Sequence, residues 1–298
     1  MIQTTVYNTV PMDPSPTHRA RSLRVEAIVL RHSDWGEADR MLTLFTLELG
    51  KVRALAKGAR RPRSRKAGHL EPFTRVSLQL ARGRDILLVT QADTQAAYSY
   101  LREDLMLTTY AAYVVELLDR FTYEEGENRA LYRLLADTLD RLNRQDVIPS
   151  VKLTDMLESL DRQDGMPESA YPPELVVRYY EMRLLDFVGF RPQLFHCANC
   201  EKEIQAEDQF FSAEAGGVLC PKCGASAAGA RPVTLDALRY MRHFQRSSFS
   251  EAARAQPATI TFREMESLMQ FYLTYLLERG LNTPAFLRRL RQEKAGNL

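Results

Sequence analysis

Between Leu23 and about Asp93, the chain alternates apolar and polar residues in short runs. In the run Thr74–Leu80, Val76, Leu78 and Leu80 fall on one face of an extended strand and polar residues fall on the other. Five such runs in about 70 residues, with no helical period among them, predict a small closed barrel. A five-stranded OB-fold is our first expectation. The runs are Arg24–Leu30, Met41–Leu47, Lys51–Lys57, Thr74–Leu80 and Asp85–Thr90.

After Tyr98 the apolar positions recur at the period of a helix, and the leucine stripes of these segments indicate the core of a helical bundle. A weaker helical pattern covers residues 151–160. A strong one covers Phe262–Glu278, where Gly280 ends it. The other predicted helices lie within residues 101–118, 131–142, 175–187 and 234–243.

These patterns predict an α+β protein of several domains. The order along the chain is a leader, a barrel, a helical domain, a small insert and the rest of the helical domain. The predicted ranges are 1–22 for a disordered leader, 23–95 for the barrel, 96–192 and 231–298 for the two helical parts, and 193–230 for the insert.

Charge is distributed unevenly along a chain whose composition is otherwise ordinary for a globular protein. The net charge is +7 over residues 1–100, −8 over 101–190 and +3 over 191–298, which sums to +2. A basic first third suits a polyanionic partner. No apolar run is long enough for a membrane span, and the polar leader lacks a hydrophobic signal core. We therefore expect a cytoplasmic protein with no membrane partner.

The basic charge is concentrated in residues 51–68, which hold eight cations and no acid. The first half of this segment alternates like a strand, and Gly58 and Pro62 mark the second half as an extended loop. Arginine forks pair with phosphate oxygens, so the segment predicts a grip on a nucleic-acid backbone rather than an ordinary solvated loop. The candidate contacts are Lys51, Arg53, Lys57, Arg60, Arg61, Arg63, Arg65 and Lys66.

All four cysteines lie in two C-x-x-C pairs separated by 19 residues. Each pair can turn two thiolates towards one metal, and such a spacer accommodates a short hairpin. Cys197, Cys200, Cys220 and Cys223 therefore predict a structural, four-coordinate Zn²⁺ site in a zinc ribbon, one ion per chain. His196, beside the first cysteine, could substitute as a ligand but is expected to be a neighbour.

Trp35, the one tryptophan, falls between the first two predicted strands. It could stack on a base or pack over the end of the barrel, and the sequence leaves both open. The nearby acids Asp34, Glu37 and Asp39 form no acid–base pair and are expected to anchor arginine. Sequence motifs for phosphate loops, serine hydrolases and zinc proteases do not occur. We therefore expect a binding protein and not an enzyme.

Five stretches resemble the bacterial RecO recombination mediators, and the resemblance covers about residues 23–280. They are Glu26–Leu30, Gly36–Arg40, Thr46 with Gly50-Lys51, Ala56–Arg60 with Arg63-Ser64, and Leu70–Phe73. The resemblance implies an OB-fold, a helical domain and an inserted zinc module. It also places the DNA contacts on the eight cations of residues 51–66 and the metal on the four cysteines.

A RecO-like function implies binding of single- and double-stranded DNA and annealing of complementary strands. The implied partners are RecR, single-stranded-DNA-binding protein and, indirectly, RecA, which is loaded during gap repair. A rival interpretation is an RNA-binding or ribosome-associated protein with the same barrel and ribbon. A metal-dependent nuclease is disfavoured because the sequence lacks a carboxylate cluster for Mg²⁺.

Overall fold

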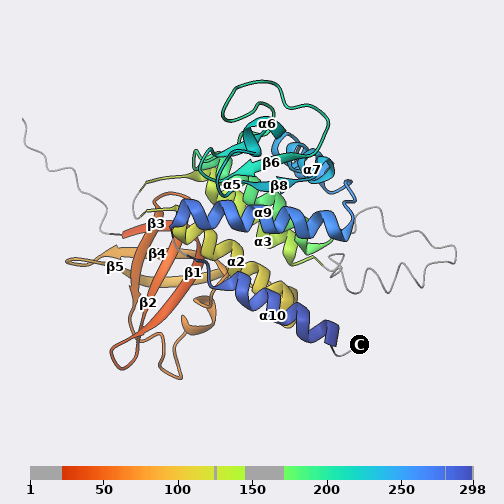
Figure 1. Cartoon of the computed structure of the whole chain (residues 1–298). Coiled ribbons are helices and arrows are strands. Elements are labelled where there is room, and N and C mark those ends of the chain that lie inside the picture. The colour runs from red at the N-terminus through yellow and green to blue at the C-terminus, as the bar shows by residue number, and fades with distance from the viewer. Residues whose placement is uncertain (1–21, 124–125, 145–170, 279, 297–298) are drawn as a thin grey trace, which may run out of the picture.

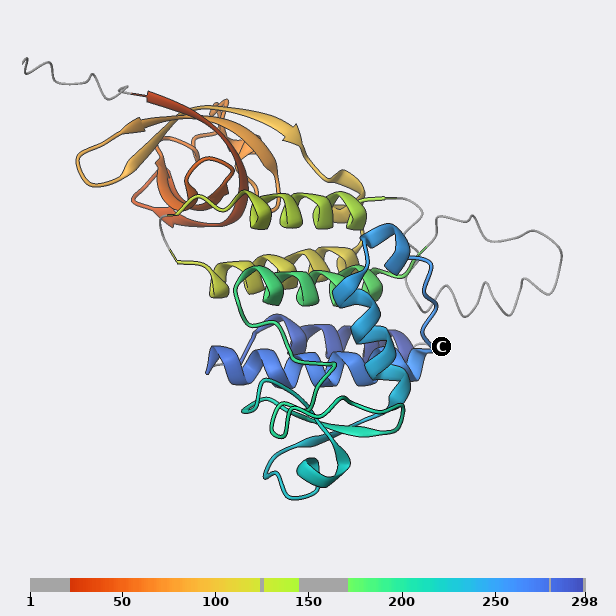
Figure 2. The same ribbon diagram turned by 90° about the horizontal axis from the view of Figure 1, so that it is seen from above.

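The computed structural model describes residues 22–123, 126–144, 171–278 and 280–296. It consists of a barrel, a stack of helices beside it and a small sheet at the far end of that stack (Figures 1 and 2). The predicted leader, apart from residue 22, and the weak helix at 151–160 lie outside the described residues.

The N-terminal strands form a closed five-stranded barrel, which confirms the predicted fold. The strands follow the order β1-β2-β3-β5-β4, in which β3 and β5 are parallel and the other paired strands are antiparallel. This is the order of an OB-fold. The strands are β1 (Ser22–Trp35), β2 (Asp39–Thr46), β3 (Gly50–Ala56), β4 (Arg75–Arg82) and β5 (Leu87–Ala96).

The alternation seen in the sequence builds the interior of the barrel. Val76, Leu78 and Leu80 of β4 are all buried there, and the residues between them are not. Leu70 follows a single 3-10 turn, Ala67–His69, and is fully buried in the same core. The barrel therefore has its own hydrophobic core, and burial of these side chains supplies most of its stability.

Helices continue the chain on one side of the barrel and pack in layers (Figure 2). Their shared core includes the fully buried rings of Tyr110, Tyr113 and Tyr180. The helices are α1 (Ser99–Glu103), α2 (Leu105–Phe121), α3 (Arg129–Leu142), α5 (Pro173–Phe187), α7 (Leu235–Arg246), α8 (Phe249–Ala252), α9 (Thr259–Leu277) and α10 (Thr283–Gly296). The sequence patterns anticipated the long helices except α10, which packs along α2.

The insert between α5 and α7 is a three-stranded antiparallel sheet in the order β7-β6-β8. Its elements are β6 (Gln209–Ser212), β7 (Gly217–Leu219), the single turn α6 (Pro221–Gly224) and β8 (Arg231–Val233). Phe211 of β6 meets Tyr272 of α9 edge to face, with ring centroids 5.5 Å apart. The insert thus shares a core with the helices rather than forming a detached module.

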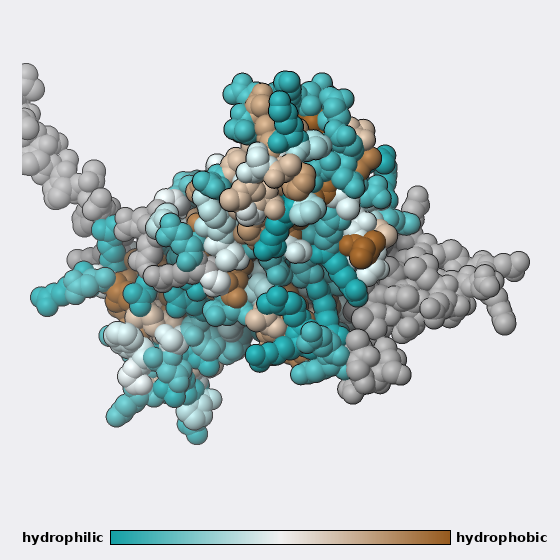
Figure 3. All heavy atoms as spheres, in the orientation of Figure 1, coloured by the Kyte–Doolittle hydropathy of each residue, from teal (hydrophilic) through white to brown (hydrophobic). Residues whose placement is uncertain are grey.

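On the face drawn in Figure 3, hydrophilic residues predominate and hydrophobic ones form only small areas. Among the helices that the structure describes, none has the length and apolar character needed to cross a membrane.

Candidate nucleic-acid interface and metal centre

The basic segment leaves the barrel at the end of β3 and is anchored at both ends. Gly58 takes a φ of +65°, a conformation that favours glycine, and turns the chain out of the strand. Ala59 and Leu70 are buried in the barrel core on either side of the loop. The cations between these two anchors therefore sit on a loop whose ends are fixed.

Six of the eight predicted cations are exposed on the outside of the barrel, and Arg60 is the one of the six that pairs with an acid, Asp34. The other five form a separate set. Within the described residues, none of the five has a carboxylate within ion-pair distance. They are Arg53, Lys57, Arg61, Arg63 and Arg65. A row of cations without acids attracts a polyanion strongly, because no internal ion pair has to be broken for binding.

Lys51 occupies a different environment from the other seven cations. Its Nζ lies 2.7 Å from Oδ1 of Asp119 and donates to the carbonyls of Asp119 and Thr122 at 2.6 and 2.8 Å. Its side chain is only 11% exposed. The Lys51 ammonium thus joins the barrel to the end of α2, which removes it from the set of cations available to a phosphate.

Arg60 and Lys66 are partly engaged within the barrel. Arg60 Nη2 lies 3.1 Å from Oδ2 of Asp34. Lys66 Nζ donates to the Val89 carbonyl at 3.1 Å, and burial lowers its pKa although Asp39 opposes that shift. These two side chains hold the loop against the barrel.

Trp35 ends β1 at the tip of the β1–β2 hairpin, and the residue is 53% exposed. It does not belong to the core that fills the barrel. Asp34 anchors Arg60 in the same hairpin, and Asp39 accepts a hydrogen bond from the Gly58 N–H at 2.7 Å. From the sequence we expect all three acids of this loop to anchor arginine, and Asp34 does so. The Asp39 carboxylate instead holds the backbone at Gly58.

Two further exposed cations, which the sequence analysis did not name as candidate DNA contacts, lie near the basic strand. Arg82 and Arg84 flank the β4–β5 turn, which the Gly83 N–H closes on the Ile86 carbonyl at 2.9 Å. Leu87, at the start of β5, pairs with Ala54 of β3, so the turn lies beside the strand that carries Arg53. The sequence showed the Arg-Gly-Arg turn, but only the parallel β3–β5 pairing places it next to the basic strand.

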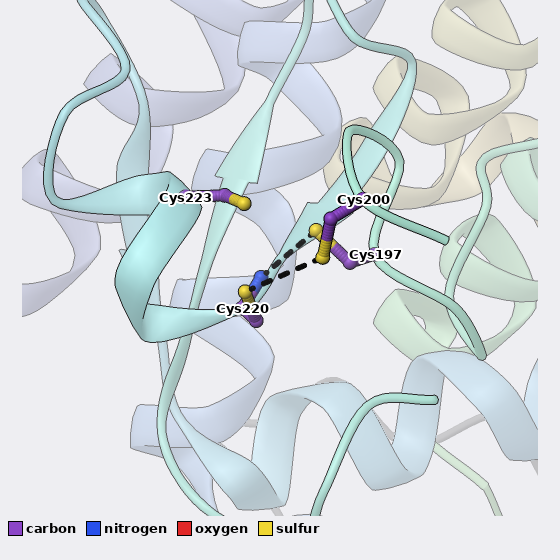
Figure 4. Close-up of side chains that lie close together, drawn as sticks. All are labelled: Cys197, Cys200, Cys220 and Cys223. Carbon is purple, nitrogen blue, oxygen red and sulfur yellow. Dashed lines mark hydrogen bonds between the residues drawn. The ribbon is translucent and has the colours of Figure 1, made fainter. Parts of the chain in front are cut away.

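The four cysteines converge from two knuckles, one before β6 and one around α6 (Figure 4). Their Sγ atoms all lie within 4.8 Å of one another, and those of Cys200 and Cys220 are 3.9 Å apart. Four sulfurs around one tetrahedral zinc, at roughly 2.3 Å each, stand about 3.8 Å from one another. The quartet therefore fits a single metal ion with four thiolate ligands.

Backbone N–H groups favour the thiolate form of one of the four cysteines, Cys197. Burial alone raises the pKa of Cys197, but N–H groups of Cys200, Cys220 and Asn199 outweigh it and lower the pKa to about 6. The Cys220 N–H donates to the Cys197 sulfur at 3.4 Å. Gly224 closes the second knuckle, and a Cβ there would lie 2.3 Å from the Phe210 ring, so a side chain does not fit. His196 lies outside the quartet.

The amino-acid sequence of the chain matches two family models and several known proteins. The family model described as recombination protein O, N terminal, matches residues 21–98, and the model for its C terminal part matches residues 102–163 and 152–285. The DNA repair protein RecO of Roseiflexus sp. (strain RS-1) is 38% identical over 274 residues, 92% of this chain and 88% of that protein.

Two further relatives extend the same likeness. The DNA repair protein RecO of Dehalococcoides mccartyi (strain CBDB1) is 32% identical over 92% of this chain and 98% of its own length. That of Pelotomaculum thermopropionicum (strain DSM 13744 / JCM 10971 / SI) is 32% identical over 92% of this chain and 96% of its own. With both family models matched in order and relatives covered almost end to end, the chain belongs to the recombination protein O (RecO) family.

Proposed function

We propose that this chain is a DNA-binding mediator of recombinational repair that grips the phosphate backbone with its basic loop. The observation that carries the proposal is the set of five exposed cations on β3 and the following loop, which have no acidic partner among the described residues. Family membership and the printed function of the relatives, DNA repair, support DNA as the polyanion.

Such a grip acts on charge and leaves the bonds of DNA intact, so the proposed role is not enzymatic. Arg and Lys side chains on phosphates carry no sequence information, and the same loop can hold single- and double-stranded DNA. Neutralised phosphates repel a second strand less, which favours annealing of complementary strands. The proposed contacts are Arg53, Lys57, Arg61, Arg63 and Arg65, with Trp35 beside them and Arg60 and Lys66 holding the loop.

Protein partners are proposed for the helical domain. The net charge of residues 101–190 is −8, which disfavours DNA on that part of the chain and suits docking of proteins. Likeness to the family supports RecR as a partner, with which the chain would help RecA displace single-stranded-DNA-binding protein in gap repair. The proposed location is the nucleoid, in the cytoplasm.

We further propose that the four-cysteine site holds one Zn²⁺ in a structural role. All four ligands come from the protein, so no coordination position is left open for substrate or water. The metal would tie the two knuckles together and thereby fix the sheet that packs on α9.

Salt dependence tests the phosphate grip directly. If five phosphates are neutralised, the logarithm of the association constant for single strands should fall with the logarithm of salt concentration with a slope of about −3 to −4. A chain with Arg61→Glu, Arg63→Glu and Arg65→Glu should lose most of its DNA binding and its annealing activity. A slope near zero, or full binding by the folded triple variant, would refute the grip.

A matched control reverses the same charge on exposed helical arginines, with Arg133→Glu, Arg239→Glu and Arg263→Glu. This variant should bind DNA as the unaltered chain does. Competition between oligonucleotides of DNA and RNA separates a repair mediator from an RNA-binding protein, because preference for RNA would support the rival interpretation.

A further inference from the structure

We infer that Trp35 is a stacking platform for an unpaired base, so that the β1–β2 hairpin distinguishes single strands from duplex at the basic loop. This inference rests on the proposed function, since it concerns the same polyanion site. It adds a base-contacting group to a surface whose other members contact only phosphate.

Trp35 is one of the exposed large hydrophobic residues of the chain, and it is the one that lies on the hairpin bonded to the basic loop. The residue is 53% exposed, whereas Val29 of the same strand is buried in the barrel core and Leu30 in the core shared with the helices. A single exposed apolar residue is common on protein surfaces, so the significance of this one lies in its location, beside a set of cations without acidic partners. Indole is also the best aromatic partner for a planar or cationic group.

The hairpin tip that carries this ring is held rigidly. Strand pairing continues to the last residue, with Trp35 opposite Asp39. Arg60 then clamps the tip: its Nη2 pairs with Asp34 at 3.1 Å, and its Nη1 donates to the carbonyls of Gly36 and Glu37 at 3.5 and 3.3 Å. A ring on a fixed backbone loses little entropy when it binds.

Two further hydrogen bonds place the hairpin that carries Trp35 beside the start of the basic loop. The Arg60 backbone N–H donates to the Ala38 carbonyl at 2.9 Å, and the Gly58 N–H donates to the Asp39 carboxylate at 2.7 Å. The hairpin and the start of the basic loop are therefore one hydrogen-bonded unit. Arg61 follows directly in the chain, so a strand bound to the loop through its phosphates would run close to the hairpin.

Only an unpaired strand can use this platform. In a duplex both faces of an internal base are covered by its neighbours, and the strand offers phosphates alone. A single strand can turn one base face onto the indole, and one such stack raises affinity by roughly 5- to 150-fold. Duplex binding then depends on the cations, and single-strand binding on the cations together with Trp35.

Arg60 becomes a positioning residue for this contact rather than a phosphate contact. Its guanidinium is already occupied by Asp34 and two carbonyls of the hairpin. We expect Arg60→Met to free the hairpin tip, which lowers the steady-state fluorescence anisotropy of Trp35 in the unbound protein. The same variant should weaken single-strand binding more than duplex binding, and Arg60→Lys should restore part of the difference.

Because Trp35 is the one tryptophan in the chain, its fluorescence reports on this site alone. The full chain is titrated with an end-labelled oligo-dT, and binding is followed by anisotropy of the label and by Trp35 emission. We expect emission to be quenched along the same binding curve. A duplex of equal length and inorganic polyphosphate should bind or compete without quenching.

The affinity arm uses Trp35→Ala, with Tyr123→Ala as the control because Tyr123 is 90% exposed on the loop after α2. Trp35→Ala should lower oligo-dT affinity by roughly 5- to 150-fold and leave duplex affinity unchanged. Binding of oligo-dT without quenching, or equal losses for both DNA forms, overturns the stacking inference and leaves the phosphate grip intact. Absence of binding to either DNA form overturns both.

Discussion

The Lys51 ammonium lies 2.7 Å from the Asp119 carboxylate and thereby joins the head of β3 to the C-terminal turn of α2. Arg31 of β1 approaches the same carboxylate at 3.2 Å. A cation that by sequence belongs to the basic segment is in fact part of the junction between barrel and helices. This single relationship separates the role of Lys51 from that of its seven neighbours.

Replacing Lys51 with methionine should destabilise the junction without weakening the DNA grip. The variant leaves the half-buried Asp119 carboxylate with Arg31 as its remaining cation, and it leaves the carbonyls of Asp119 and Thr122 without their donor. We expect a loss of about 1–3 kcal/mol in the free energy of unfolding. Urea unfolding measures the loss, and the salt dependence of DNA binding should keep its slope. Lys57→Met is the control, because it should reduce DNA affinity at unchanged stability. If Lys51→Met instead reduced DNA affinity and left the free energy of unfolding unchanged, Lys51 would be a phosphate contact.

The metal centre should stabilise more than the insert itself. Cys200→Ser removes one thiolate from an exposed position, so bound zinc should fall well below about one ion per chain. Because Phe211 of the insert packs on Tyr272, hydrogen exchange should rise in β6 and β7 and also in α9. His196→Ala should keep its zinc. Full metal content in Cys200→Ser, measured by atomic emission, would refute the four-thiolate site.

The sequence predicted the barrel and the metal quartet because both depend on local patterns. Alternation in β4 arises from the pleat of one strand, and each C-x-x-C pair arises from one turn of backbone. Lys51 shows where this reasoning ends. Strand period places Lys51 and Arg53 on the same outer face of β3. Which of them meets another domain depends on Asp119, which lies 68 residues away in the sequence.

The C-terminal helix illustrates the same limit of local pattern. Residues 283–296 carry four basic side chains, three of them within the run Arg288–Arg291, and the sequence analysis did not predict a packed helix there. Arg291 instead reaches into the bundle, where Nη1 lies 2.6 Å from Glu266 and Nη2 donates to the Tyr110 hydroxyl at 2.8 Å. The two acceptors lie on α9 and α2, far from Arg291 in the sequence. The residues near Arg291 in the sequence therefore do not reveal these contacts.

Glu116 should control the docking of α10 onto α2. Its Oε1 accepts from the Asn282 N–H at 2.9 Å, its Oε2 accepts from the Thr283 N–H at 3.0 Å, and it also accepts from the Thr283 hydroxyl. A carboxylate at these N–H groups stabilises the start of a helix, and Glu116→Gln should cost about 1 kcal/mol. Hydrogen exchange within residues 283–293 should then increase, while exchange in α3 stays unchanged. Unaltered protection of α10 would contradict this role.

A buried carboxyl group should give the helical domain a measurable pH dependence. Glu181 is fully buried, accepts from the Tyr113 hydroxyl at 2.5 Å and lies 3.0 Å from Arg178. Burial raises its pKa to about 7, although Arg178 and Tyr113 oppose the shift. The pKa of an unfolded glutamate is about 4.3, so between these two values the folded chain holds a proton that the unfolded chain has released.

The contribution of Glu181 to stability should therefore be largest below about pH 4 and should decline as the pH rises to about 7. Glu181→Gln keeps an acceptor for Tyr113 but cannot titrate. Between about pH 4 and about pH 7, the free energy of unfolding should therefore fall less in this variant than in the unaltered chain, and the difference should reach up to roughly 3 kcal/mol. Urea unfolding at several pH values compares the two chains, and Glu214→Gln, at an exposed position, is the control. Curves for Glu181→Gln and the unaltered chain that stay parallel would show that Glu181 is ionised in the folded protein throughout the range, held by Arg178.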